Sequence, residues 1–204
     1  MALAERNEMD FAFSEEQDAL RASARDYLAD RFPLDRVVQL ADSDAGWDPA
    51  TWKELAEMGW LDPELGVLEH AVLAEETGFG LLPAPLFATV GLAWPLLDDR
   101  LRGAVAAGDR SATLASAGDV HASGDRLTGV RTLVPDLTSV TDVVVPTSDG
   151  VFVVDVAAHP DVVVPRSTMD RTRRLGELHL DGTPARRLDV SLDTLTDVRR
   201  RSLA

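Results

Sequence analysis

The period of the apolar residues changes once along this sequence, and this change constrains the fold more than any other feature. Up to about Ala107 the apolar residues recur every three or four positions, as on one face of an amphipathic helix. From about Ala112 to Leu188 they follow the two-residue period of strands, in short runs rich in β-branched residues. Helices that come first and strands that follow them predict a chain of the α+β class.

Start signals define helices in the first region. Ser14 and Gln17 have the spacing of a capping box, which predicts a helix that begins there and ends before Pro33. Asp48 followed by Pro49 is typical of the start of another helix. Further helices are expected over residues 34–41, 64–77, 86–97 and 98–107, and the third of these is expected to be interrupted near Trp94 and Pro95.

Turn residues separate the apolar runs of the second region and indicate short strands. The expected strands cover residues 112–117, 126–134, 140–145, 151–156, 162–166 and 175–180. Short strands without helices between them favour an antiparallel barrel or sandwich. The helical period returns at Leu192. The sequence therefore predicts a helical domain over residues 1–108, a domain of strands over 109–190, which is the antiparallel β-barrel domain if the family resemblance described below holds, and the start of a truncated further helix over 191–204.

Charge and composition exclude several classes of function. The chain has 20 basic and 35 acidic side chains, a net charge of −15, which disfavours binding to nucleic acid and to anionic membranes. It has no cysteine, and therefore no disulfide framework, thiolate metal site or cysteine nucleophile. Because no apolar run is long enough to span a membrane and the N-terminus lacks the pattern of a signal peptide, we expect a cytoplasmic protein.

Motifs that carry chemistry by themselves are scarce. The four histidines do not have a metal-ligand spacing, and the sequence contains neither a phosphate-binding loop nor a nucleophile elbow. We therefore expect no metal site and identify no catalytic residue. A concentration of arginines in the second region indicates either a contact for phosphates or an acidic partner, or exposed arginines that balance an acidic chain. It consists of Arg166, Arg171, Arg173, Arg174, Arg186 and Arg187.

Four phrases occur along the sequence in an informative order. They are MDFAFSEEQ at residues 9–17, WKELAEMGWL at 52–61, RLTGVR at 126–131 and MDRTRRL at 169–175. In order and spacing they resemble the acyl-CoA dehydrogenase family, which has an opening D-F-x-x-(S/T)-E-E-Q, then W-x-x-L-A-E-L-G-W-L, and later a strand ending in L-x-G-x-K. The resemblance covers nearly the whole chain. It implies an acyl-CoA dehydrogenase-like fold, with an N-terminal helical domain followed by a small β-barrel.

The resemblance also implies a flavin reaction that needs more than this chain. Members of the family bind FAD between the barrel and a C-terminal helical bundle. A glutamate, usually from that bundle, takes the α-proton of an acyl-CoA while the flavin accepts the β-hydride. The sequence ends where the bundle would begin. Since the family includes heteromeric assemblies with one degenerate subunit, the implied partner is a second acyl-CoA dehydrogenase-like chain or another copy of this one, and the implied substrate is an acyl thioester.

The residues at the family's cofactor and substrate positions depart from its pattern. The family's W-I-T, which lies against the flavin, falls on Leu133, Val134 and Pro135, the candidate cofactor-binding residues. Leucine lacks the aromatic surface, and proline has neither a hydroxyl nor an N–H to donate. The loop T-E-x-x-A-G-S-D is contracted, and its candidate substrate-binding residues are Ala117, Gly118 and Asp119.

Two functions follow from the resemblance. The chain is either one part of a flavin-dependent dehydrogenase that acts on an acyl thioester, or a flavin-free partner subunit that completes or stabilises a catalytic relative. The departures favour the second role for the chain itself. In both cases we expect the isolated chain to be inactive and to hold FAD weakly. A small-molecule binding module unrelated to flavin is a third interpretation, with no motif behind it.

Overall fold

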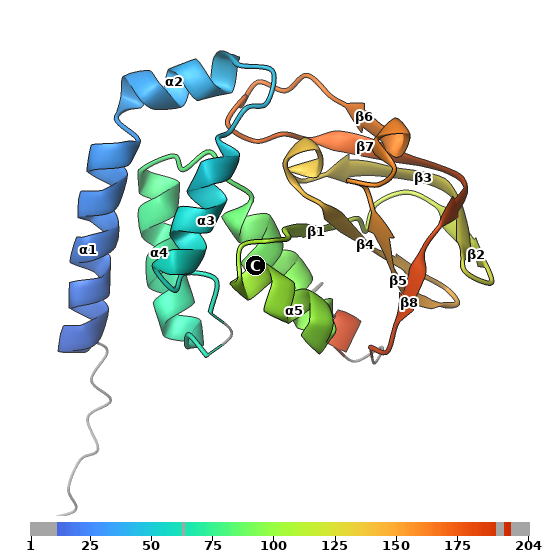
Figure 1. Ribbon diagram of the computed structural model, residues 1–204, viewed down its shortest axis with the longest axis horizontal. Helices are drawn as coiled ribbons and strands as arrows, with labels where there is room; N and C mark the ends of the chain where they lie inside the picture. The colour runs from blue at the N-terminus through green and yellow to red at the C-terminus, as the bar shows by residue number, and fades with distance from the viewer. Residues whose placement is uncertain (1–11, 63, 191–193, 197–204) are drawn as a thin grey trace, which may run out of the picture.

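The computed structural model describes residues 12–62, 64–190 and 194–196, and its elements follow the expected order, helices first and strands second (Figure 1). The predicted α+β class is thereby confirmed. The helices are α1 (Glu15–Arg31), α2 (Leu34–Asp42), α3 (Pro49–Glu57), α4 (Val67–Phe79), η1 (Phe87–Ala93), η2 (Trp94–Leu96) and α5 (Asp99–Ala106), with the short turns η3 (Leu137–Ser139) and η4 (Pro160–Val162) in the strand region. The strands are β1 (Ala112–Leu114), β2 (Val120–Ser123), β3 (Arg126–Val134), β4 (Asp142–Thr147), β5 (Gly150–Asp155), β6 (Val163–Pro165), β7 (Gly176–Pro184) and β8 (Arg186–Leu188).

Side-chain caps begin two of the helices where the sequence predicts. Ser14 accepts a hydrogen bond from the amide of Gln17 at 3.2 Å, and the Gln17 side chain accepts one from the amide of Ser14 at 3.0 Å. Both halves of the capping box are therefore formed at the start of α1. At α3, the carboxylate of Asp48 accepts from the amide of Ala50 at 3.0 Å, with Pro49 as the first helical residue.

The helix expected over residues 86–97 is irregular. Its first part, η1, is a π-helix, and its second part, η2, is a 3₁₀ turn that contains Pro95. Proline has no N–H for a helical hydrogen bond, which accounts for the change of helix type there. Within η1, the Thr89 hydroxyl donates to the carbonyl of Ala112 at 2.9 Å and accepts from its amide at 3.1 Å. These two bonds join the helical region to β1.

The strands form two four-stranded sheets, and the described residues do not close into the single antiparallel barrel that we expected. One sheet has the order β1-β4-β5-β8 and the other β2-β3-β7-β6. Pairing is antiparallel throughout except between β1 and β4, which run parallel from the pair Ala112–Asp142 to the pair Leu114–Val144. The sequence did not predict β2 and β8, which are edge strands with exposed polar residues such as His121 and Arg187.

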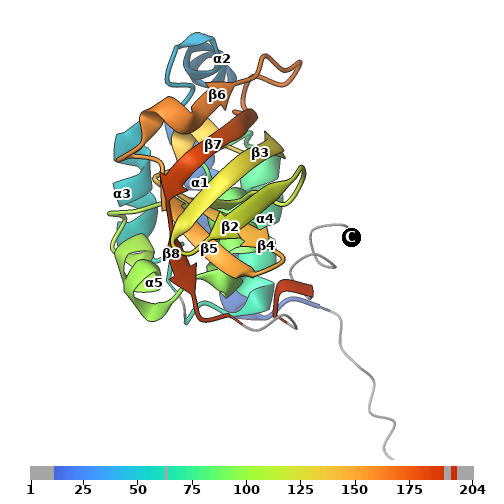
Figure 2. The same ribbon diagram turned by 90° about the vertical axis from the view of Figure 1, so that its right-hand side faces the viewer.

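The first sheet is buried on both faces, which explains its near-continuous valines. Val143 and Val145 of β4 and Phe152 of β5 point into a core between the two sheets. Val144 of β4 and Val153 of β5 point the other way, into the core formed with the helices. The second sheet covers the side away from the helices, with β7, β3 and β2 in front in Figure 2.

The segment after β8 is described only in part. Residues 194–196 form a helical turn, and Leu195 is buried in the core that the helices share with the first sheet. The rest of the helix that the sequence predicts over 191–204 lies outside the described residues. Within the described part of the chain, no helix is both long and apolar enough to cross a membrane.

Candidate functional site

The candidate cofactor-binding residues lie at the end of β3, in strained backbone. Leu133 has a φ of +52° and is 70% exposed, whereas Val134 is buried. Pro135 begins a turn, and Asp136 after it has a φ of +49°. Left-handed backbone is unfavourable for a bulky residue such as leucine. The fold therefore holds the Leu133 side chain toward solvent at a cost in strain.

The candidate substrate-binding residues lie directly beside this segment. Ala117 forms a β-bridge with Thr132, and its carbonyl accepts from the Thr132 amide at 3.0 Å. The carbonyl of Asp119 accepts from the amide of Val130 at 2.9 Å. The structure thus brings together the two sets that the sequence identified separately, with Ala117, Gly118 and Asp119 all exposed at the surface.

Gly118 and Arg131 fix the shape of the loop over residues 116–119. Gly118 has a φ of +89°, and a Cβ atom there would lie 2.5 Å from the carbonyl oxygen of Val130. Arg131 is buried below the loop and donates to the carbonyl of Ser116 at 3.3 Å, and also to the carbonyls of Gly118 and Pro146. Sequence reasoning did not identify Arg131 as a site residue, although it closes the phrase RLTGVR.

A buried acid lies under the same turn. Asp136 contacts Arg173 at 3.5 Å and the amide of Arg174 at 3.4 Å. Burial raises the pKa of the Asp136 carboxyl above its usual value, against the opposing effect of Arg173. Asp136 therefore links the end of β3 to the connection between β6 and β7.

Most arginines of the basic concentration have partners within the chain. Arg166 pairs with Glu177 at 2.6 Å, and with His179 it lowers the pKa of Glu177 to about 2. Arg174 donates to the carbonyl of Ser43 at 2.7 Å, at the end of α2. The further pairs are Arg171 with Asp42, Arg173 with Asp136, and Arg186 with Asp98. These contacts favour a role in holding the fold together over a role in binding phosphates.

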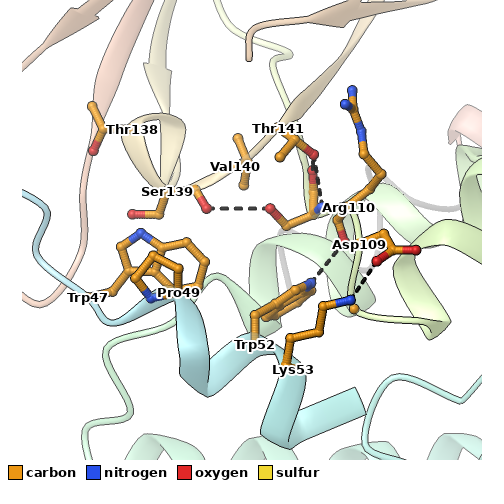
Figure 3. A pocket seen from close by; sticks show the side chains of 12 residues that line it. Trp47, Pro49, Trp52, Lys53, Asp109, Arg110, Thr138, Ser139, Val140 and Thr141 are labelled. Atoms are coloured by element: carbon orange, nitrogen blue, oxygen red, sulfur yellow. Dashed lines mark hydrogen bonds and ion pairs between the residues drawn. The ribbon is translucent and has the colours of Figure 1, made fainter. Parts of the chain in front are cut away.

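A pocket of about 350 Å³ lies where the helices meet the strands, and we call it the junction pocket (Figure 3). Its walls come from three segments that are far apart in the sequence, which is why no motif predicted it. They are residues 47–53 around the start of α3, 108–111 between α5 and β1, and 138–141 at η3 and the entry to β4.

The sequence matches no protein-family model and no curated protein. Solved structures do match. A structure described as the Tcur3481-Tcur3483 steroid ACAD G363A variant is 27% identical, with a TM-score of 0.78. The ChsE4-ChsE5 complex from Mycobacterium tuberculosis is 23% identical, with a TM-score of 0.77. A glutaryl-CoA dehydrogenase from Mycobacterium smegmatis in complex with FADH2 is 14% identical, with a TM-score of 0.65.

This chain has the fold of an acyl-CoA dehydrogenase. The match to the first of these structures covers 92% of this chain, and the match to the second covers 95%. The likeness therefore includes both the helices and the strands. The chain itself spans about 60% of the length of the matched chains, 60% of the first and 62% of the second. The resemblance inferred from the four sequence phrases is thereby confirmed at the level of the fold.

The residues at the end of β3 fit a flavin ring poorly. In an acyl-CoA dehydrogenase-like fold this is the candidate flavin position, and an isoalloxazine ring needs a flat apolar surface and hydrogen-bond donors for its carbonyl oxygens. Leu133 offers no aromatic face, and Pro135 has no N–H. The amide of Thr132 already donates to Ala117. We therefore assign no step of the reaction to a flavin held at these residues.

The strain at Leu133 can be tested by substitution. We expect Leu133→Gly to raise the free energy of unfolding by about 0.5–1 kcal/mol, because glycine relieves a left-handed backbone and the exposed leucine loses little burial. Val130→Gly, in ordinary strand backbone of the same strand, is expected to lower it by about 1 kcal/mol. Urea unfolding of both variants measures the difference. Equal destabilisation by the two glycines would contradict the assignment of strain.

Proposed function

We propose that this chain is the partner subunit of a heteromeric acyl-CoA dehydrogenase, and that it does not itself hold the flavin. The observation that carries the proposal is the end of β3, where an exposed, strained Leu133 and Pro135 stand in place of an aromatic residue and a donor. A companion acyl-CoA dehydrogenase-like chain then supplies the cofactor contacts and the general base. The reaction is the removal of a proton and a hydride from adjacent carbons of an acyl thioester.

The relatives support a heteromeric assembly. The two matched structures with TM-scores of 0.77 and 0.78 are described by pairs of chain names, and one is described as a complex. One of them is also described as a steroid ACAD, whereas the structure from Mycobacterium smegmatis is a glutaryl-CoA dehydrogenase. In our proposal this chain forms a heteromeric assembly like those two structures, and the substrate is an acyl thioester.

Exposed apolar side chains on this chain support an interface. Soluble monomers rarely expose large contiguous apolar surface, so neighbouring exposed apolar residues, such as Leu34 and Val38 one turn apart on α2, favour a partner. Those exposed by 40% or more include Leu34, Val38, Val67, Leu68, Phe79, Leu81, Phe87, Leu133 and Met169. A second copy of this chain is the alternative partner for the same surface.

A second candidate function keeps the flavin on this chain. The fold is shared with a dehydrogenase from Bacillus anthracis complexed with FAD, at 16% identity and a TM-score of 0.69. The chain spans 40% of that protein's length. In this alternative the chain is the N-terminal part of a flavin-dependent dehydrogenase, and the rest of the flavin site comes from another segment.

Co-expression separates the two candidates. We expect the chain purified alone to show no flavin absorbance in the visible spectrum, because Leu133 and Pro135 lack the expected contacts. We expect it to co-purify with a companion dehydrogenase-like chain, encoded beside it, as a yellow complex that oxidises an acyl thioester. Sedimentation velocity of the chain alone and of the mixture measures the assembly.

Two outcomes would overturn the proposal. Stoichiometric flavin that stays with the isolated chain through gel filtration would favour the second candidate. A compact monomer at every concentration that does not bind the companion chain would remove the partner role.

A further inference from the structure

We propose that the junction pocket is a binding site for a small, uncharged aromatic molecule that carries a carbonyl acceptor. The proposal does not depend on the partner role, because every residue that lines the pocket belongs to this chain. Its volume of about 350 Å³ falls at the lower end of the range of ligand sites, which suits a ligand of one or two rings.

The apolar walls of the pocket favour a flat ring. The rings of Trp47 and Trp52 meet edge to face, with centroids 6.4 Å apart and an angle of 77° between the planes. Pro49 stands beside Trp47 on the same side in Figure 3. Indole faces bind planar apolar groups with little loss of side-chain entropy, because the two tryptophans are rigid.

The surrounding hydrogen bonds hold these walls in place before any ligand binds. The indole N–H of Trp52 donates to the carbonyl of Arg110 at 2.9 Å. The hydroxyl of Thr141 accepts from the amide of Ser111 at 2.9 Å, and the Ser111 hydroxyl donates to the carbonyl of Ser139 at 3.4 Å. A preformed site avoids the cost of ordering its side chains on binding.

Three donors that line the pocket have no hydrogen-bond partner among the residues that the structure describes, namely the indole N–H of Trp47 and the hydroxyls of Thr138 and Ser139. Figure 3 shows the side chains of Trp47 and Ser139 close to each other at one end of the pocket. By contrast, Lys53 at the other end already contacts Asp109. The ligand therefore needs an acceptor near Trp47 and Ser139, and a carbonyl oxygen with two lone pairs can accept from both.

The charges around the pocket favour an uncharged ligand. The ammonium of Lys53 is balanced by Asp109, and the guanidinium of Arg110 is balanced by Asp142 and Asp155. The pocket therefore has no uncompensated positive charge to attract an anionic ligand. The net charge of −15 on the whole chain also disfavours an anion. Its donors likewise do not suit a cationic group.

Acetophenone is the probe that tests this proposal, with benzoate and benzylammonium as charged probes of similar size. We expect saturable binding of acetophenone to the full chain with a dissociation constant of about 1 mM, the affinity of a fragment-sized ligand. We expect both charged probes to bind at least about tenfold more weakly. Ligand-observed NMR titration measures all three.

Matched variants place the probe. Ser139→Ala is expected to weaken the binding of acetophenone about fivefold, which is the effect of one hydrogen bond. The same variant is expected to leave the binding of ethylbenzene unchanged, because ethylbenzene has no acceptor. Trp47→Leu is expected to weaken the binding of acetophenone and of ethylbenzene at least about fivefold. Trp94→Leu, which lies outside the pocket, is expected to change the binding of neither. Thermal unfolding by circular dichroism confirms that each variant is folded at the titration temperature.

Three results would overturn the proposal. The first is the absence of saturable acetophenone binding at about 10 mM, ten times the expected dissociation constant. The second is acetophenone binding that is unchanged in both Trp47→Leu and Ser139→Ala, and the third is tighter binding of either charged probe.

Discussion

Replacing Arg110 by methionine is expected to lower the free energy of unfolding by about 3 kcal/mol, because the change leaves a buried carboxylate without its partner. Arg110 donates to both oxygens of Asp142 at 2.7 Å and contacts Asp155 at 2.8 Å. The side chain of Asp142 is only 4% exposed, so water cannot replace the lost contacts. The two carboxylates raise the pKa of Arg110 further above its usual value.

The position of this cluster makes its loss global. Arg110 lies in the connection between α5 and β1, whereas Asp142 begins β4 and Asp155 ends β5. The cluster therefore joins the end of the helical region to the sheet that packs against it. For a domain of this size, about 3 kcal/mol corresponds to a fall in melting temperature of about 6–12 °C.

An exposed ion pair of the same type is the control. Arg36 and Asp48 approach to 3.6 Å with side chains 45% and 43% exposed, and Arg36→Met is expected to cost less than about 1 kcal/mol. A double variant, Arg110→Met with Asp142→Leu, is expected to recover part of the loss, because no buried charge then remains unpaired at position 142. If Arg110→Met lowers the melting temperature no more than Arg36→Met, the cluster does not have the assigned role.

The helices were predictable because their signals are local. The bonds between Ser14 and Gln17, and the cap formed by Asp48, depend on residues two or three positions apart, so the sequence alone displays them. The strand region was less predictable because its pairing is not local. The parallel pair of β1 with β4 joins residues about thirty positions apart, and the buried valines of β4 cannot reveal which of the two cores each one faces.

The sequence analysis names the residues of the candidate site but not their geometry. The resemblance placed Leu133 to Pro135 and Ala117 to Asp119, and the structure brings both sets to one edge of β3. The left-handed backbone at Leu133 has no sequence signal, because leucine is not a residue that favours it. The junction pocket was not predictable at all, since it is formed by three separate segments.

Gly118→Ala is expected to destabilise the chain by about 2–4 kcal/mol, the second large effect that the structure predicts. A left-handed φ of +89° costs an alanine about 1 kcal/mol, and the added Cβ would lie 2.5 Å from the carbonyl oxygen of Val130, an overlap that costs a further 1–3 kcal/mol or so. That carbonyl belongs to β3 in the middle of its sheet, so it cannot move away without disturbing β7.

Gly182 provides a matched control for this prediction. It has a φ of +59° with no atom within 4 Å of an added Cβ. Gly182→Ala is therefore expected to lower the free energy of unfolding only by the cost of alanine in left-handed backbone, about 1 kcal/mol. Hydrogen exchange gives a local readout, because the amide of Thr132 donates to Ala117, next to Gly118. We expect Gly118→Ala to speed exchange at Thr132 while Gly182→Ala leaves it slow. Equal losses of stability in the two variants would mean that the close approach of Gly118 to β3 is not what shapes the loop over residues 116–119.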